Sequence, residues 1–237
     1  MIDYHYWATP NGHKVAIFLE ESGLEYRVTQ VNLSENKQFG KDFLRISPNN
    51  KIPAIIDDAP EDGGAPIAIF ESGAILIYLA DKIGKFIPSD RRGRVEVMQW
   101  LFWQVGGLGP MAGQQVFFRR AAPEPFPFAI ERYTNETKRL FGVLNERLAD
   151  RPYLAGDEYT IADMAAYPWA APYTLLSQDI DKFPHVERWL DAIASRPATQ
   201  RAYALAKAIN PNAPQPPAPR SAKAGFIYDR TAILIPG

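Results

Sequence analysis

The chain has 237 residues and a formal net charge of −1, with 46% apolar and 22% charged residues. This composition suits a globular protein of one large or two small domains and excludes wholesale disorder and fibrous repeats. The balanced charge gives no general attraction to nucleic acid or to an anionic membrane surface. The sequence contains no cysteine, which excludes disulfides, thiolate metal sites and a protein thiol as nucleophile.

Targeting and metal-binding signals are also absent from the sequence pattern. No stretch approaches the roughly 20 apolar residues that span a bilayer. The first residues include Asp3 and lack the basic segment and apolar core of a signal peptide. The three histidines, His5, His13 and His185, are too scattered to suggest a metal site. We therefore expect a cytoplasmic protein that interacts with neither nucleic acid nor membrane and holds no metal.

The first 87 residues alternate between strand and helix patterns. Helices are expected over 13–22, 39–46 and 72–82, two of them closed by the glycines at 23 and 84. Strands are expected over 2–7, 26–33, 51–57 and 66–70. A strand–helix–strand start followed by a hairpin predicts a four-stranded mixed sheet with helices packed on it.

From residue 91 onward the pattern is helical throughout. Apolar residues at helical spacing predict helices over 95–105 and 130–148, and two more near 161–176 and 186–194. Two glycines at 106 and 107, followed by Pro110, predict an interruption after the first of these helices. We expect an N-terminal domain over 1–87, an all-α domain over 91–208, and a linker between them.

Residues 209–237 form a proline-rich extension. Five prolines lie between positions 211 and 219, which predicts an extended and solvated segment. Apolar residues return at 226–228 and 232–235, and a disordered tail rarely carries so many. We expect this end of the chain to dock on the body of the protein or on a partner chain.

One motif has a purely structural interpretation. Thr160-Ile161-Ala162-Asp163 is a capping box, in which the threonine hydroxyl and the aspartate carboxylate satisfy amides at a helix start.

Two further motifs lie where strands and helices meet. Thr9 precedes Pro10, which favours the first helical turn, so Thr9 is a candidate N-cap, and polar groups at a helix N-terminus also stabilise a bound thiolate. A cis bond between Ile52 and Pro53 would present main-chain groups to an added peptide strand. The alternatives are a cap with a turn at Thr9, and an ordinary trans proline that opens a strand at Pro53.

A third junction is Glu71-Ser72, between a strand and a helix. Ser72 is a candidate N-cap, and the adjacent amides form an anion site. Glu71 beside it would pair with an ammonium group, so the pair suits the head group of an α-amino acid. The alternative is simple helix capping without a ligand.

Together, these features resemble a cytosolic glutathione transferase. The stretches TPNGHK (9–14), FLRISPNNKIPAI (43–55), FESGAILIYLA (70–80) and QWLFWQVGGLGPM (99–111) are most similar to the bacterial Nu class. This class has disulfide-bond oxidoreductase activity and is related to the fungal nitrogen-regulator prion proteins. The resemblance covers about residues 1–205 and implies an α/β thioredoxin-like N-terminal domain, an all-α C-terminal domain and a homodimer.

The resemblance also implies roles for individual residues. Thr9 and Asn11 would lie at the sulfur of glutathione as the catalytic pair, and no protein thiol takes part. The other implied roles are main-chain pairing with the cysteinyl part at Ile52, beside a cis Pro53; binding of the γ-glutamyl head at Glu71 and Ser72; contact with the glycyl side at Gln38 and Lys51; and contact with a second glutathione at Arg132, with Gln104 as a weaker candidate.

The function implied is that of a glutathione-dependent disulfide-bond reductase. Each site would bind two glutathiones, or one glutathione disulfide, and act on small disulfides. The same thiolate would also serve conjugation to electrophiles or reduction of hydroperoxides, so a transferase or peroxidase is the enzymatic alternative. A glutathione-binding regulatory module without catalysis is the other alternative.

Overall fold

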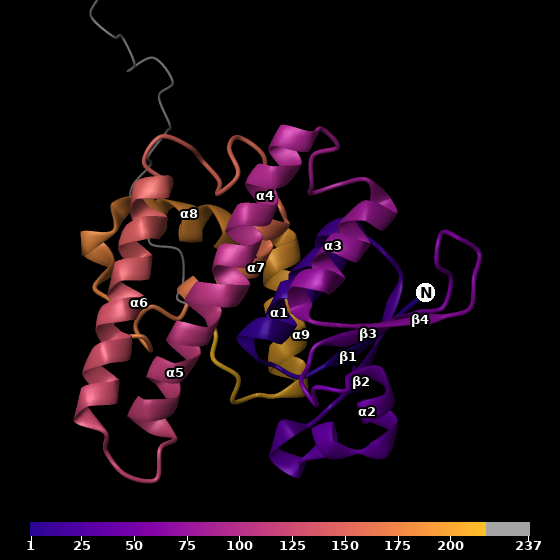
Figure 1. Ribbon diagram of the computed structural model, residues 1–237, viewed down its shortest axis with the longest axis horizontal. Coiled ribbons are helices and arrows are strands. Elements are labelled where there is room, and N and C mark those ends of the chain that lie inside the picture. Colours follow the sequence, from indigo (N-terminus) through magenta and orange to yellow (C-terminus); the bar gives the residue numbers. More distant parts are fainter. Residues whose placement is uncertain (217–237) are drawn as a thin grey trace, which may run out of the picture.

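A computed structural model of the chain describes residues 1–216. A sheet with its helices occupies one side of the molecule, and a group of long helices occupies the other (Figure 1). The molecule therefore has two structural halves, whose boundary lies near the segment between residues 84 and 90.

The N-terminal half contains the expected four-stranded mixed sheet. The strands are β1 (Ile2–Tyr6), β2 (Tyr26–Gln30), β3 (Ala54–Asp57) and β4 (Ile67–Phe70). Their order is β2-β1-β3-β4, in which β1 and β2 are parallel and the other pairs antiparallel. The helices of this half are α1 (Pro10–Ser22), α2 (Lys41–Ile46) and α3 (Ser72–Ile83), with short 3₁₀ turns at Leu33–Glu35 and Lys37–Phe39. The predicted thioredoxin-like arrangement is confirmed.

The C-terminal half is helical, as predicted. Its elements are α4 (Arg91–Trp103), the π-helical turn Gln104–Leu108, α5 (Gly109–Arg120), α6 (Pro127–Arg147), α7 (Ile161–Ala170), the 3₁₀ turn Ile180–Lys182, α8 (Pro184–Ala194) and α9 (Pro197–Ile209). The predicted interruption at the paired glycines is the π-helical turn, and α4 runs through it into α5 as one column (Figure 1).

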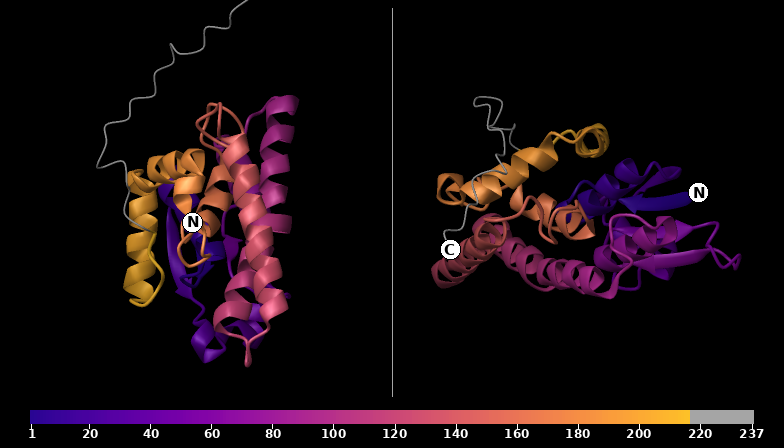
Figure 2. Two further views of the ribbon diagram at one scale, coloured as in Figure 1. Left: turned by 90° about the vertical axis from the view of Figure 1, so that its left-hand side faces the viewer. Right: turned by 90° about the horizontal axis from the view of Figure 1, so that it is seen from above.

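One helix of this half was missed, and the predicted end of another was wrong. Helix α9 was not anticipated, because its buried face is built mainly from alanines (Ala198, Ala202 and Ala206), which give little apolar signal. Helix α7 ends at Ala170 rather than near residue 176, where Pro172 follows two residues later and disfavours a helical residue before it. In Figure 2 (left), α9 stands apart from the α4 and α6 columns, with parts of the N-terminal half between them.

Helix α1 joins the two halves. It packs against α3 of its own domain and against α7 and α9 of the helical domain. Every residue from Gly12 to Leu19 is buried, so the helix is surrounded on all sides. Gly12 has no space for a side chain, because a Cβ atom there would lie 2.4 Å from the carbonyl oxygen of Trp7. The glycine therefore permits the close approach of the start of α1 to the end of β1.

The predicted capping box at the start of α7 is confirmed. The Thr160 amide donates to the Asp163 carboxyl at 3.0 Å, and the Thr160 hydroxyl accepts from the Ala162 amide at 3.3 Å. Asp163 also accepts from the Leu154 amide at 2.9 Å and from the Trp189 indole at 3.0 Å. This carboxyl therefore holds together α7, α8 and the loop that precedes α7.

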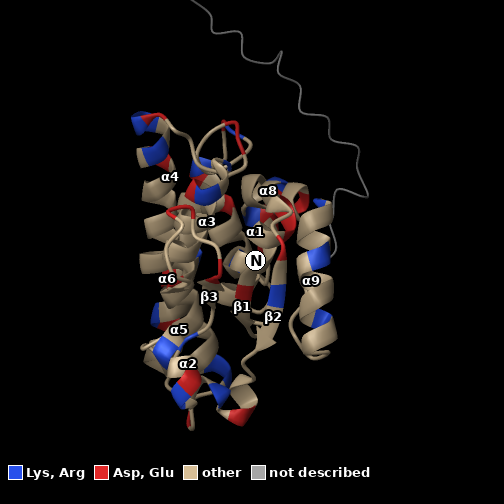
Figure 3. Cartoon of the chain, turned by 90° about the vertical axis from the view of Figure 1, so that its right-hand side faces the viewer, with Lys and Arg blue, Asp and Glu red and all other residues tan. Residues whose placement is uncertain are grey.

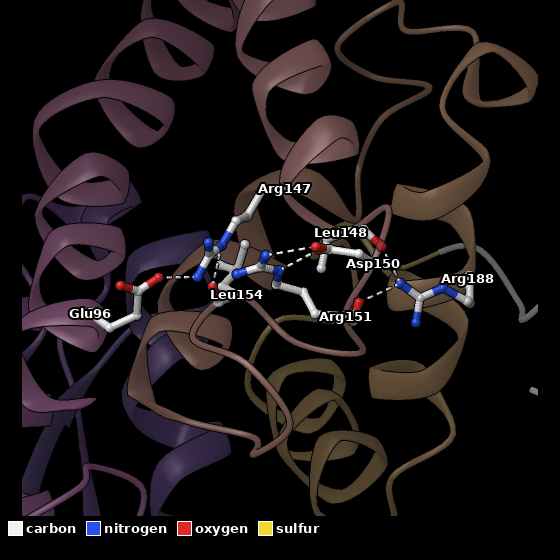
Figure 4. Close-up of polar contacts among 7 residues, drawn as sticks. All are labelled: Glu96, Arg147, Leu148, Asp150, Arg151, Leu154 and Arg188. Carbon is white, nitrogen blue, oxygen red and sulfur yellow. Dashed lines mark hydrogen bonds and ion pairs between the residues drawn. The ribbon is translucent and has the colours of Figure 1, made fainter. Parts of the chain in front are cut away.

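Arginines fix the connection between α6 and α7 (Figure 4). Arg147 donates to the Leu154 carbonyl at 2.7 Å and pairs with Glu96 of α4. Arg188 of α8 donates to the carbonyls of Leu148 and Arg151 at 2.7 and 2.8 Å. These contacts satisfy carbonyl groups that a loop would otherwise present to solvent.

Charges of both signs are interspersed on the face drawn in Figure 3, which agrees with the balanced composition. Within residues 1–216, no helix has the length and apolar character needed to cross a bilayer.

Candidate active site

A cleft of about 520 Å³ lies between the two halves of the molecule. Its walls come from the start of α1, the segments around residues 38 and 51, helices α5 and α7, and the last described residues. Of the ten predicted site residues, five line it: Thr9, Asn11, Gln38, Lys51 and Ile52.

Thr9 is the N-cap of α1, as predicted. Its hydroxyl oxygen accepts from the Gly12 amide at 3.3 Å. A hydroxyl that accepts through its oxygen still carries a proton to donate. Because Thr9 lines the cleft, its hydroxyl can cap the helix and donate to a ligand at the same time.

Asn11 is oriented by a residue that the sequence did not single out. Its Oδ1 accepts from the indole N–H of Trp169, on α7, at 2.9 Å. With the oxygen so engaged, the amide offers its NH₂ group as the remaining hydrogen-bonding end. Trp169 also lines the cleft, and its ring lies 3.3 Å from the position of a Cβ on Gly113. The cleft therefore has an oriented amide donor close to the start of α1.

The segment before β3 contributes main-chain groups. The Ile52–Pro53 peptide bond is cis, as predicted, and both residues are buried. Among the described residues, neither the N–H nor the carbonyl of Ile52 has a main-chain partner. Nearby, the side-chain oxygen of Gln38 is buried without a partner among the described residues. These groups suit a ligand with an extended peptide backbone.

Glu71 and Ser72 lie outside the lining of this cleft, at the start of α3. The expectation that Ser72 is the N-cap was wrong: Glu71 holds the N-cap position, with φ of 70° and ψ of 114°, and Ser72 is the first helical residue. Propensity favours serine as a cap, but the left-handed backbone at Glu71 shifts the helix start by one residue.

Behind Ser72 lies a buried lysine. The Nζ of Lys14, on α1, donates to the Ser72 hydroxyl at 3.2 Å and to Gln104 Oε1 at 2.5 Å. Gln104 is fully buried, so the structure does not bring it to the cleft surface. Its side chain instead links the π-helical turn to the N-terminal domain through Lys14.

Burial changes the protonation of two neighbouring residues on α1. It lowers the pKa of Lys14 to about 7, against the opposing effect of the negative charge of Glu71. It also lowers the pKa of His13 to about 4. His13 accepts from or donates to the Tyr6 hydroxyl at 3.0 Å and packs against Tyr203. His13 is therefore neutral at physiological pH, whereas Lys14 is close to its midpoint.

Arg132 is exposed on α6 and does not reach the cleft. It lines a separate hollow of about 650 Å³ between α5 and α6, together with Met111 and Tyr133. Its predicted contact with a second glutathione therefore stays a prediction.

The last described residues form part of the cleft wall. Pro214, Gln215 and Pro216 line it, and Ala213 is buried. Residues 211, 212, 214 and 215 are nevertheless exposed, in agreement with the expectation of a solvated segment, whereas the expectation of docking was based on the apolar residues further along the chain. The apolar segments 226–228 and 232–235 lie outside the described residues.

Within residues 1–216, no group of His, Asp or Glu side chains is arranged to hold a metal ion. The contributions that the sequence did not reveal are those of Trp169 and of the residues at 214–216. A tryptophan distant in sequence from the α1 junction carries no local signal for its contact with Asn11.

Family models for the N-terminal and C-terminal domains of glutathione S-transferases match residues 1–81 and 129–197. The chain belongs to the glutathione S-transferase family. Among its curated relatives is the disulfide-bond oxidoreductase YfcG of Escherichia coli, which is 54% identical over 87% of this chain and 96% of the relative. The resemblance stated from the sequence, and the expectation of a glutathione-dependent enzyme, are confirmed.

Solved relatives contain the expected ligand. A glutathione transferase from Burkholderia graminis, with two glutathione molecules bound per subunit, superimposes with a TM-score of 0.81 at 46% identity, over 85% of this chain and 86% of that one. A glutathione transferase from Pseudomonas putida, with one glutathione disulfide bound per subunit, gives 0.79 at 41% identity, over 85% and 90% of the two chains.

Proposed function

We propose that this protein is a glutathione-dependent disulfide-bond reductase that binds two glutathiones, or one glutathione disulfide, in the cleft between its domains. The observation that carries the proposal is the pair of donors at the start of α1. The Thr9 hydroxyl and the Asn11 amide line the cleft, and the whole chain contains no cysteine. The names and bound ligands of the relatives support the same conclusion.

The reaction uses only sulfur supplied by ligands. The thiolate of the first glutathione attacks one sulfur of the substrate disulfide, forms a mixed disulfide and releases the first substrate thiol. The second glutathione, as thiolate, attacks the glutathione sulfur of this mixed disulfide, forms glutathione disulfide and releases the second thiol. Holding both glutathiones in one cleft gives the second step the advantage of proximity.

Thr9 and Asn11 act by stabilising the thiolate. A free thiol with a pKa of about 8.5 is only a few per cent ionised at neutral pH. Hydrogen bonds to the charged form, together with the N-terminus of α1, favour the thiolate. The remaining predicted contacts are Ile52 on the cysteinyl main chain, Gln38 and Lys51 at the glycyl end, and Glu71 and Ser72 at the γ-glutamyl head. The buried, unpartnered oxygen of Gln38 fits an N–H donor from a ligand.

The test is turnover of a small dialkyl disulfide with reduced glutathione, measured as formation of glutathione disulfide. We expect Thr9→Val and Asn11→Ala to lower kcat on the order of 100-fold and to change the Kd for glutathione much less. Asn49→Ala, at an exposed residue outside the cleft lining, is the matched control. A wild-type rate no higher than that of buffer would refute the proposal.

The enzymatic alternative is conjugation of electrophiles or reduction of hydroperoxides, because the same thiolate serves those reactions. Rates on an aryl halide, a hydroperoxide and a disulfide, compared under the same conditions, rank the three activities. Binding of glutathione or its disulfide in a calorimetric titration, without turnover of any of the three substrates, would favour the glutathione-binding regulatory module without catalysis.

We also propose a homodimer, supported by apolar side chains that one chain leaves exposed. Val95 and Phe102 on α4 are 53% and 59% exposed, and Ile67 and Phe70 on β4 are exposed as well. Burying such side chains is the usual driving force of dimerisation. Light scattering at the mass of one chain would contradict this. A cytoplasmic location fits the proposed chemistry, because the cytosol keeps glutathione reduced.

A further inference from the structure

The buried ammonium of Lys14 lies directly behind the first residue of α3. Lys14 is 1% exposed, and its Nζ lies 3.2 Å from the Ser72 hydroxyl and 2.5 Å from Gln104 Oε1. Lysine is among the residues least often buried, and it normally has a charged partner when it is. The position of Lys14 therefore calls for an explanation beyond packing.

The immediate partners of Lys14 are neutral. Its two acceptors are a hydroxyl and an amide, and Glu71 is the described acid whose charge acts on it. On the same helix, the neutral His13 is engaged with Tyr6 and with Tyr203 of α9. Burial raises the pKa of both tyrosines, which therefore add no charge near neutral pH. No carboxylate is in direct contact with this ammonium among residues 1–216.

The hydrogen bonds at Lys14 suit either of its protonation states. Two acceptors match the two N–H groups of a neutral amine, whereas an ammonium has three. The amide nitrogen of Gln104 is buried and has no partner among the described residues. Since burial lowers the pKa of Lys14 to about 7, a small change in local charge is enough to shift its protonation.

An anion at the start of α3 would supply that change. The first amides of a helix bind anions, and α3 presents Ser72 and Gly73 there. A negative charge in front of Ser72 would favour the ammonium form of the lysine behind it.

We propose that Lys14 is a positioning residue for a ligand carboxylate. Ser72 and Gln104 hold the Lys14 side chain behind the start of α3, where its ammonium attracts the γ-glutamyl carboxylate of glutathione. Binding of this carboxylate favours the protonated form of Lys14, so the protein takes up a proton. This inference rests on the proposed function, because it takes glutathione as the ligand. It adds an electrostatic component to the γ-glutamyl site that the resemblance implies at Glu71 and Ser72.

The experiment measures proton uptake when S-methylglutathione binds. This ligand keeps both carboxylates of glutathione but has no thiol, so ionisation of sulfur cannot contribute. Calorimetry at pH 7.5 in two buffers with different heats of ionisation gives the number of protons exchanged. We expect the wild-type protein to take up about half a proton or more per subunit, and its affinity to weaken as the pH rises from 6.5 to 8.5.

Three variants separate this role from a structural one. Lys14→Met removes the charge, and we expect a Kd about tenfold higher at pH 6.5 and no lysine-dependent proton uptake. Gln104→Glu places a carboxylate against the ammonium and holds Lys14 protonated, so we expect the affinity to lose its pH dependence. Lys82→Met is the matched control, because Lys82 is ion-paired with Asp57 away from Ser72; it should keep the wild-type uptake.

The outcomes are distinguishable. Binding of S-methylglutathione by the wild-type protein without proton uptake would overturn the role of Lys14 and leave the proposed function standing. The same would follow if Lys14→Met retained the full wild-type uptake. Failure of the wild-type protein to bind glutathione, its disulfide and S-methylglutathione would instead refute the proposed function. The wild-type measurement needs no variant, so it decides even if Lys14→Met fails to fold.

Discussion

Two buried polar clusters, each at the start of a helix, differ in how completely their groups are paired. At the start of α7, Asp163 accepts from two main-chain amides, from the Thr160 hydroxyl and from the Trp189 indole. At the start of α3, Lys14 has two neutral acceptors, and the Gln104 nitrogen beside it is unpartnered among the described residues.

The difference separates a structural cluster from one suited to a ligand. Four donors around Asp163 complete its hydrogen bonding and join three elements of the helical domain. The cluster at Lys14 is less complete and lies beside the residues expected to bind the γ-glutamyl head. Buried polar groups with incomplete hydrogen bonding occur mainly at functional sites. We therefore expect substitutions in the complete cluster to affect stability most.

The largest effect should come from breaking the complete cluster. Asp163→Ala leaves the Leu154 amide, the Thr160 amide and the Trp189 indole without their acceptor, so we expect a loss of about 4 kcal/mol in the free energy of unfolding. Urea denaturation measures it. Asp150→Ala, at an exposed carboxylate paired with Arg151, should change stability by less than about 0.5 kcal/mol. Equal effects of the two substitutions would remove the contrast.

The incomplete cluster at Lys14 should make the free energy of unfolding depend on pH. The pKa of Lys14 is about 7 in the folded protein and about 10.4 in an unfolded chain, so between these values the unfolded state binds more protons. Lys14 therefore makes stability rise with pH, by about 2 kcal/mol from pH 7 to pH 9. Unfolding of wild type and Lys14→Met at both pH values isolates this contribution. The prediction fails if the two proteins respond to pH identically.

His13 sharpens the comparison, because it is buried among aromatic groups rather than beside the start of α3. Its pKa of about 4 lies below the unfolded value of about 6.5, so its contribution to stability is lost as the pH falls through this window. We expect a loss of about 2 kcal/mol between pH 6 and pH 4.5 that is absent in His13→Phe. Unlike the effect at Lys14, this one should not change when S-methylglutathione saturates the protein.

The smallest effect tests an orienting contact in the cleft. Trp169→Phe removes the N–H that fixes Asn11 Oδ1 but keeps an aromatic ring, so we expect a loss of about 1 kcal/mol of transition-state stabilisation. This corresponds to roughly a fivefold fall in kcat/KM. Trp100→Phe, at a tryptophan outside the cleft lining, is the control. A fall of the same size in both variants would show that Trp169 has no special role in orienting Asn11.

Most of the fold followed from local patterns, but the site only partly did. Strand alternation, the paired glycines and the Thr160–Asp163 motif each carry local information, and each predicted its element. Helix α9 was missed because its buried residues are mainly alanines, which also occur on the exposed faces of helices and so give no clear apolar pattern. The N-cap at Glu71 was missed because N-cap propensities favour serine and do not indicate that the backbone of Glu71 has a positive φ.

Long-range contacts account for what was missed at the site. The resemblance identified Thr9 and Asn11, and the structure brings them together with Gln38 and Ile52 in one cleft. The partner that orients Asn11 is 158 residues away, so no local pattern could find it. The burial of Lys14 likewise depends on Gln104, 90 residues distant, whereas an isolated lysine is expected at the surface.

The cleft presents the Thr9 hydroxyl and the Asn11 amide at the start of α1, and no cysteine exists anywhere in the chain, which has a consequence for oxidative damage. Enzymes that keep a reactive thiol can be permanently disabled when that sulfur reaches the sulfinic or sulfonic state. Under the proposed function, any sulfur that is over-oxidised in this way belongs to a glutathione molecule, which dissociates from the protein. The catalyst would renew its vulnerable atom at every turnover and need no repair system for it.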